Sequence, residues 1–112
     1  MSLSRKLILS LACTALLAPL AARADMPTFE LVAKDGRFEP ETIEVPAGTR
    51  FRLTVTNHNA GPEEFETTRP FRELVLAPGV TRSTVYPPLQ PGTYPFFGDF
   101  HKDTAKGQFI AK

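Results

Sequence analysis

Apolar and polar residues alternate one by one through much of this chain, and Pro or Gly interrupts each alternating run. In the segment TRFRLTVTN, residues 49–57, the apolar side chains are Phe51, Leu53 and Val55. Successive side chains of a β-strand point to opposite faces, so this pattern predicts a strand with one face in the core. No window of ten residues after Ala24 has helical periodicity without a Pro or Gly inside it.

Seven or eight short strands are predicted from runs of this kind. The other clear runs are TFELVA (28–33), TIEV (42–45), GTYPFF (92–97), GQFIA (107–111) and two short runs in LVLAPGVTRSTVY (74–86) on either side of a Pro-Gly turn. Strands punctuated by Pro and Gly at this spacing are typical of a sandwich or barrel. The sequence therefore predicts an all-β domain.

The first 24 residues are expected to be a signal peptide and not part of that domain. Arg5 and Lys6 precede a nearly continuous apolar stretch over residues 7–20, and a small-x-small cleavage sequence ends at Ala24. The apolar stretch is shorter than the roughly 20 residues that a membrane-spanning helix needs. A retained membrane anchor and a lipoprotein signal at Cys13 are weaker alternatives.

Cleavage after Ala24 would leave one domain, residues 25–112, exported to the periplasm. Three of the 13 basic residues and none of the 12 acidic ones lie before residue 25, so this domain has a net charge of −2. Its Lys and Arg are scattered and form no basic stripe, which argues against a nucleic-acid partner. The one cysteine, Cys13, leaves with the signal peptide. The domain therefore has neither a disulfide nor a thiolate metal ligand.

Two segments of the chain resemble the cupredoxin family. They are DGRFEPETIEVPAGTRFRLTVTNHNAGPEEFE and PGTYPFFGDFH, and the resemblance extends from about Phe29 to Ala111. More narrowly, they resemble the EfeO-type cupredoxin-like domains of bacterial periplasmic iron-uptake systems. The resemblance implies a small Greek-key β-sandwich with a metal site at one end, assembled from two loops.

The resemblance also places the ligand positions of a blue-copper site on this sequence. Glu63 falls where the first His ligand is expected, Gly98 where the Cys is expected, and His101 where the second His is expected; the axial Met position falls near Ala105 or Lys106. Type 1 copper needs a Cys thiolate, so the sequence excludes that cofactor.

Carboxylates and one imidazole remain as candidate ligands for iron or copper. We expect Glu66, Asp99 and His101 to share one metal ion, with Glu63 as a fourth candidate. Oxygen ligands and one imidazole suit Fe, Mn or Cu(II) better than Cu(I). Strand alternation places Glu63 on the same face as the core residue Phe65, and Glu64 and Glu66 on the other face.

Several of these residues have simpler alternative roles. The glutamates could be the solvated face of an edge strand, and Asp99 could cap a turn. His58 and Met26 are weaker candidate ligands, in a loop and near the mature N-terminus. The arginines of TTRPFREL, residues 67–74, could neutralise the glutamates or form a docking surface for a partner protein.

Three functions are consistent with these features. The first is a periplasmic metal-binding module that handles iron, or Cu(II), together with an inner-membrane iron permease or another component of iron uptake. The second is a ferroxidase, an enzyme that oxidises Fe(II) to Fe(III). The third is a metal-free adaptor that docks a partner through residues 67–74. No nucleophile elbow or phosphate-binding glycine loop is present, which leaves no other enzyme class supported.

Overall fold

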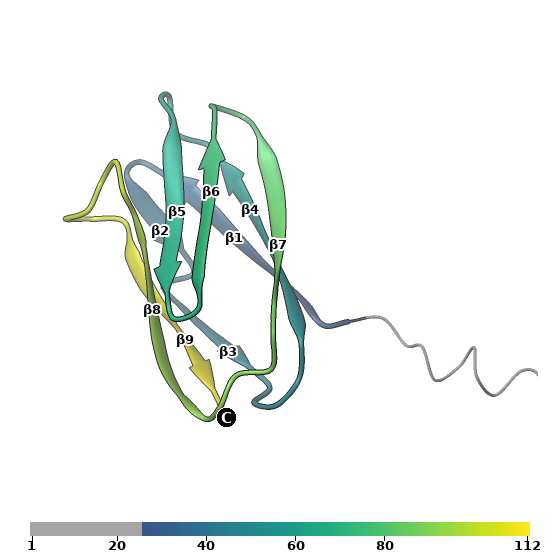
Figure 1. Cartoon of the computed structure of the whole chain (residues 1–112). Coiled ribbons are helices and arrows are strands. Elements are labelled where there is room, and N and C mark those ends of the chain that lie inside the picture. The colour runs from purple at the N-terminus through teal and green to yellow at the C-terminus, as the bar shows by residue number, and fades with distance from the viewer. Residues whose placement is uncertain (1–25) are drawn as a thin grey trace, which may run out of the picture.

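The computed structural model describes residues 26–112, and these form nine β-strands in two sheets (Figure 1). The predicted signal peptide, its cleavage site at Ala24 and Cys13 lie outside the described residues. The strands are β1 (Thr28–Lys34), β2 (Arg37–Glu39), β3 (Thr42–Val45), β4 (Phe51–Asn57), β5 (Glu63–Thr68), β6 (Phe71–Leu76), β7 (Thr81–Tyr86), β8 (Gly92–Gly98) and β9 (Lys106–Ala111).

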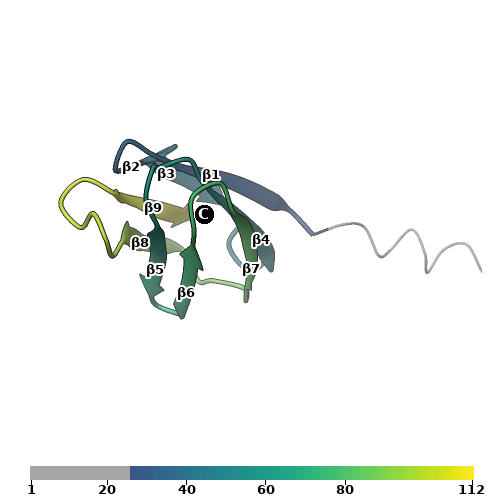
Figure 2. The same ribbon diagram turned by 90° about the horizontal axis from the view of Figure 1, so that it is seen from above.

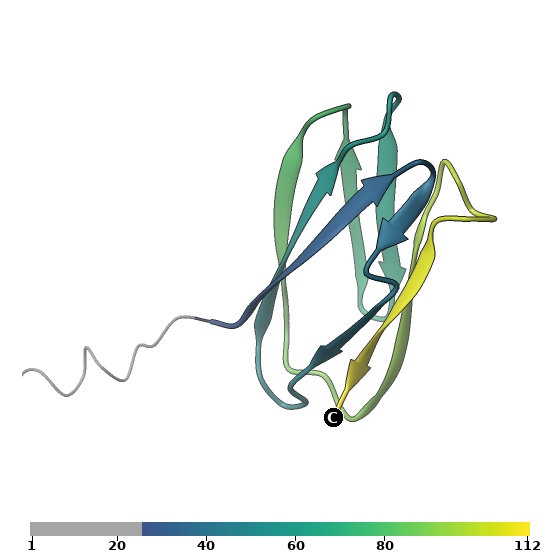
Figure 3. The same ribbon diagram turned by 180° about the vertical axis from the view of Figure 1, so that it is seen from behind.

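The two sheets form the layers of a sandwich, as the view from above shows (Figure 2). One sheet has the strand order β2-β1-β4-β7 and the other β3-β9-β8-β5-β6. The pairs β1/β4 and β3/β9 are parallel and the remaining pairs are antiparallel. Figure 3 shows the same sandwich from behind, with the four-stranded sheet toward the viewer.

Aromatic side chains from both sheets fill the core. Phe51 of β4 lies 5.4 Å from Phe109 of β9, measured between ring centroids. Phe96 of β8 lies 5.1 Å from Phe109 and 5.6 Å from Phe38 of β2. All four rings are buried. Interlocking rings of this size supply the apolar burial that a small domain without disulfides depends on.

The all-β prediction is confirmed, with one strand more than expected. β2 was not predicted because three residues are too few to show an alternating pattern. It pairs with β1 through a turn in which Asp35 and Gly36 both have positive φ, 52° and 72°. Within residues 26–112 there is no helix, and so none long and apolar enough to cross a membrane.

The arginines of residues 67–74 are used within the fold. Nε and Nη2 of Arg72 on β6 donate hydrogen bonds to the Val85 carbonyl on β7, at 3.3 and 3.2 Å. Arg69 donates to the Thr93 carbonyl and lies 4.7 Å from the centroid of the Tyr94 ring. The Arg72 contact joins the edge strands of the two sheets, β6 and β7, where unpaired backbone groups would otherwise be exposed. Among residues 26–112, no ion pair joins these arginines to the glutamates of β5.

Candidate metal centre

The start of β5 and the loop after β8 meet at one end of the sandwich. The loop, residues 99–105, projects from the body between β8 and β9 (Figure 1). Asp99 at its start donates its backbone N–H to the Glu64 carbonyl at 2.8 Å. The loop closes on itself, because the N–H of Gly98 donates to the Ala105 carbonyl and the N–H of Ala105 donates to the His101 carbonyl. The two acidic segments therefore lie side by side, as the sequence predicts.

Glu63 points into the sandwich and is completely buried, at 0% exposure. Its Oε2 lies 2.6 Å from Nδ1 of His101. Its Oε1 accepts the backbone N–H groups of Glu64 and Phe100, at 3.0 and 3.1 Å. The carboxylate therefore has three hydrogen-bond donors around it, which offset the loss of water on burial.

The carboxylate of Glu63 fills the space beside Gly98. A Cβ atom at position 98 would lie 2.7 Å from Cδ of Glu63 and 2.9 Å from Cβ of Ala105, both too close for a real contact. Position 98 therefore has no room for a thiolate side chain while Glu63 is in place. Since residues 26–112 also contain no cysteine, the residues present do not fit type 1 copper.

The contact with Glu63 also determines the tautomer of the His101 ring. An ionised carboxylate only accepts hydrogen bonds, so in the neutral imidazole the proton lies on Nδ1 and Nε2 keeps a free lone pair. The side chain is 38% exposed. A carboxylate that orients a histidine through one ring nitrogen, leaving the other free, is the usual arrangement around metal-ligating histidines.

A second group of acidic side chains lies on the outer face of the five-stranded sheet. Carboxylate oxygens of Glu64, Glu66 and Asp99 lie within 4.8 Å of one another, and all three residues are half-buried. Lys102 lies 3.2 Å from Asp99 and offsets part of this charge. Glu73 of β6 is the register partner of Glu66, so a fourth carboxyl group borders the cluster.

Desolvation and the crowding of like charges together change the acidity of Glu64. Its pKa is raised from 4.5 to about 7, first by desolvation, then by a hydrogen bond with Glu73 and by repulsion from Glu73, Asp99 and Glu66. Near neutral pH this carboxyl group therefore holds a proton in a large fraction of molecules. A cation placed among these oxygens would relieve the repulsion that keeps the proton bound.

The four predicted ligands fall into two groups. Glu66 and Asp99 meet each other together with Glu64, while Glu63 and His101 form a separate pair facing inward. Within the described residues, His101 and Glu63 belong to no group of three or more side chains that could share one ion. Glu64 is the member that the sequence prediction left out, although alternation already places it on the face of Glu66.

The weaker candidates lie apart from both groups. His58 is exposed in the β4–β5 loop, where its backbone N–H donates to the Ala33 carbonyl. It joins no set of potential ligands among residues 26–112. Met26 precedes β1, whose opposite end leads to the turn at Asp35 beside the site.

The sequence is similar to a known protein family and to a protein from another organism. The sequence profile of a family described as a cupredoxin-like domain matches residues 7–111. An uncharacterised protein of Rickettsia prowazekii (strain Madrid E) is 41% identical over 81 residues, which are 72% of this chain. The chain spans 65% of the length of that relative.

Solved structures of auracyanins have a similar fold. The reduced auracyanin of Roseiflexus castenholzii superposes with a TM-score of 0.68 at 14% identity, over 80% of this chain and 99% of that chain. Auracyanin A, a "blue" copper protein of Chloroflexus aurantiacus, gives 0.67 at 15% identity, over 79% of this chain and 100% of that one. At these identities the likeness concerns the fold alone.

Proposed function

Because the chain belongs to the cupredoxin-like domain family, we propose that it is an exported protein that binds one metal ion, Fe(III) or Cu(II), without a thiolate. In this proposal iron is cargo, handed to or from an inner-membrane permease of a periplasmic iron-uptake system. The signal-like pattern of residues 1–24 supports export, and the resemblance to EfeO-type domains supports the role in iron uptake.

The observation that carries the proposal is the meeting of three carboxylates from two distant segments. Glu64 and Glu66 come from β5 and Asp99 from the loop after β8, with oxygens within 4.8 Å of one another. Carboxylate oxygens bind transition-metal ions at about 2.0–2.2 Å, so oxygens that share an ion lie up to about 4.4 Å apart. Small rotations of these half-buried side chains are enough to reach that spacing.

The chemistry of the cluster favours a hard cation. Anionic oxygen ligands suit Fe(III) and Cu(II) and suit Cu(I) poorly. They also stabilise Fe(III) over Fe(II), because the higher charge gains more from anionic oxygens. Among the cluster residues only Asp99 has a cationic partner in the described structure, the side chain of Lys102.

In this proposal the Glu63–His101 pair supports the site from the inner side. Glu63 holds the backbone N–H of Phe100 and the ring of His101, the two residues that follow Asp99. It therefore fixes the loop that presents Asp99 to β5. His101 is proposed as an additional ligand through Nε2, which the Glu63 contact leaves free.

Native mass spectrometry of the purified protein tests the proposal, with Fe(II), Fe(III), Cu(II) and Mn(II) offered in competition. One Fe(III) or Cu(II) per chain is expected. The variant Glu64→Gln/Glu66→Gln/Asp99→Asn should lose the ion. A matched variant that neutralises three exposed glutamates on other strands, Glu30, Glu39 and Glu44, should retain it. Equal binding by the two variants would reject the site.

One observation supports the adaptor function as a second candidate. Phe71 and Val75 are 58% and 48% exposed on β6, on either side of Glu73. Large apolar side chains exposed on one face of an edge strand often mark a surface for a protein partner. If the protein binds none of the four ions, a Phe71→Ser/Val75→Ser variant that loses a partner in a periplasmic cross-linking experiment would favour this function.

A further inference from the structure

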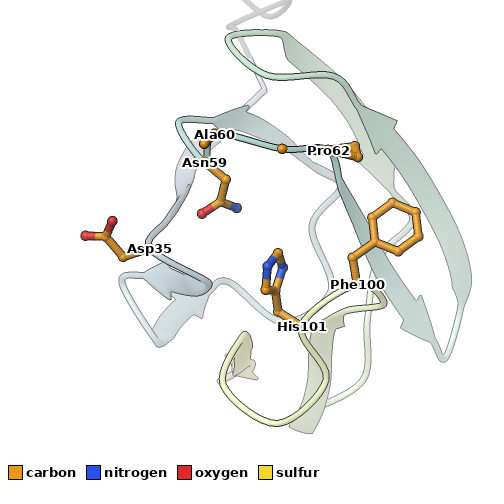
Figure 4. Close-up of a pocket in the computed structure, with 7 residues that line it drawn as sticks. Asp35, Asn59, Ala60, Pro62, Phe100 and His101 are labelled. Carbon is orange, nitrogen blue, oxygen red and sulfur yellow. The ribbon is translucent and has the colours of Figure 1, made fainter.

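A pocket of about 540 Å³ opens beside His101, on the inner side of the loop that carries Asp99 (Figure 4). Its walls come from the turn at Asp35, from residues 59–62 between β4 and β5, and from Phe100 and His101. None of Glu64, Glu66 and Asp99 lines it. Pockets of this size commonly hold small organic molecules.

Asn59 leaves a buried hydrogen-bond donor unused at this pocket. Its Oδ1 accepts the Gly36 N–H at 2.9 Å, and its backbone N–H donates to Oδ1 of Asn57 at 2.9 Å. The bond from Gly36 fixes the orientation of the side-chain amide and identifies Nδ2 as its free end. Nδ2 is buried, with no hydrogen-bond partner among residues 26–112. A buried donor without a partner is costly and rare in native structures.

The pocket therefore offers one donor and one acceptor on two rigidly held side chains. The donor is Nδ2 of Asn59, whose side chain is held by Gly36 and whose backbone is held by Asn57. The acceptor is Nε2 of the neutral His101 ring, whose other nitrogen is held by Glu63. Figure 4 shows both side chains directed into the pocket from opposite walls. Less than 1 Å² of Asn59 Nδ2 is exposed, so binding requires a side chain of the wall to move and let a ligand atom reach it.

The charge of the lining disfavours an anion, and the unused donor of Asn59 disfavours a simple cation. The only charged residue of the lining is Asp35, and no Lys or Arg takes part, so an anion would be repelled. A simple cation would face the unused donor of Asn59. An apolar wall is supplied by Pro62 and by the ring of Phe100, which is 49% exposed.

We propose that this pocket binds an uncharged primary carboxamide. The carbonyl oxygen of the ligand accepts the hydrogen bond from Asn59, and the amide N–H on the same side donates to Nε2 of His101. A flat apolar substituent packs against Phe100 and Pro62. None of the three cluster carboxylates lines the pocket, but the ligand uses the same Nε2 of His101 that is proposed above as an additional metal ligand. The carboxamide therefore binds the metal-free protein.

Titration of the ¹⁵N-labelled protein at pH 8 with three probes of nearly equal size tests the proposal. Benzamide has the required donor and acceptor, benzoate has two acceptors, and N-methylbenzamide keeps its N–H on the side opposite the carbonyl. Benzamide should shift the backbone amide signals of residues 59–61, 100 and 101 to saturation. The other two should bind at least about tenfold more weakly, the equivalent of one hydrogen bond. Equal affinities, or no saturable shift with benzamide, would overturn the proposal.

Asn59→Asp is the decisive variant, because it keeps the shape of the side chain and the acceptor for Gly36 N–H. It replaces the free donor with an oxygen, so the pocket then presents two acceptors. Benzamide should bind at least about tenfold more weakly to the variant, whereas benzamidine, which has two donors, should bind more tightly than to the original protein. Unchanged amide signals outside the pocket verify the fold. Unchanged benzamide affinity in this variant would contradict the assigned contacts.

Discussion

Nδ1 of His101 and Oε2 of Glu63 are 2.6 Å apart, and this contact joins the loop after β8 to the first residue of β5. Glu63 is fully buried, and its other oxygen accepts two backbone N–H groups. The carboxylate occupies the space next to Gly98, where the cupredoxin resemblance places a cysteine. A carboxylate–imidazole pair thus closes this end of the sandwich without a thiolate.

The substitution Glu63→Gln should reverse the tautomer of His101. The single oxygen of the new amide side chain would be needed by the N–H groups of Glu64 and Phe100, so its NH₂ group would face Nδ1. Nδ1 must then accept a hydrogen bond, and the ring proton moves to Nε2. The ring ¹⁵N chemical shifts of His101 report this change, and a His58→Gln background removes the signals of the other histidine. A proton that stays on Nδ1 would show that the pair does not set the tautomer.

Gly98→Ala should destabilise the fold by about 1–3 kcal/mol, the usual cost of overpacking. The added methyl group would lie 2.7 Å from Cδ of Glu63. Gly61→Ala is the matched control, since a Cβ there has no atom within 4 Å, and it should change stability by less than about 0.5 kcal/mol. Urea denaturation measures both variants.

The clash with Glu63 also predicts non-additivity. Shortening Glu63 to Ala removes the carboxylate that the new methyl group would contact. The double variant Glu63→Ala/Gly98→Ala should therefore be less destabilised than the sum of the two single variants. Strictly additive free energies of unfolding would mean that the two positions do not compete for the same space.

The carboxylate cluster should make the protein less stable as the pH rises from about 4.5 to about 7. The pKa of Glu64 is raised from 4.5 to about 7 in the folded protein, so the folded state binds this proton more tightly than the unfolded state. The resulting stabilisation is complete below the unfolded pKa of 4.5 and is lost as the pH passes through the folded pKa. Chemical denaturation at a series of pH values measures the trend. Glu64→Gln should flatten it in this range, and an equal slope in the variant would assign it to other groups.

The affinity for a metal ion should increase with pH, whereas the stability of the fold decreases. Glu64 must lose its proton to act as a ligand, so the affinity for Cu(II) should increase as the pH rises through about 7. Calorimetric titration in two buffers with different ionisation enthalpies counts the protons released. Release of a proton is expected from the original protein at a pH just below the raised pKa of Glu64. The Glu64→Gln variant should release fewer protons, and equal release would place the ion elsewhere.

Residue alternation was sufficient to predict which glutamates face inward and which face outward. It places Glu63 beside the core residue Phe65, and Glu64 and Glu66 on the opposite face, as observed. The same rule gave the strands, except for β2, which is too short to alternate. The resemblance to cupredoxins added that residues 63 and 101 lie near one another, which alternation within single strands does not show.

Alternation cannot show whether His101 lies near Glu66 and Asp99, because their distance depends on the path of the loop after β8. The turn from Gly98 to Ala105 directs Asp99 to the outer face and His101 toward Glu63, through backbone hydrogen bonds that leave no pattern in the sequence. Asn59 gave no signal either. Its unused Nδ2 donor is recognised only from the structure, in which Gly36 occupies Oδ1 and Asn57 occupies the backbone N–H.

Anomalous X-ray diffraction at the iron and copper edges directly locates a metal ion held by Glu64, Glu66 and Asp99. Crystals grown with Fe(III) or Cu(II) should show one peak within about 2.0–2.2 Å of oxygens from all three side chains. The peak should be absent from crystals of the Glu64→Gln/Glu66→Gln/Asp99→Asn variant. A fully occupied peak elsewhere on the protein, with none at these carboxylates, would show that they are not the metal site.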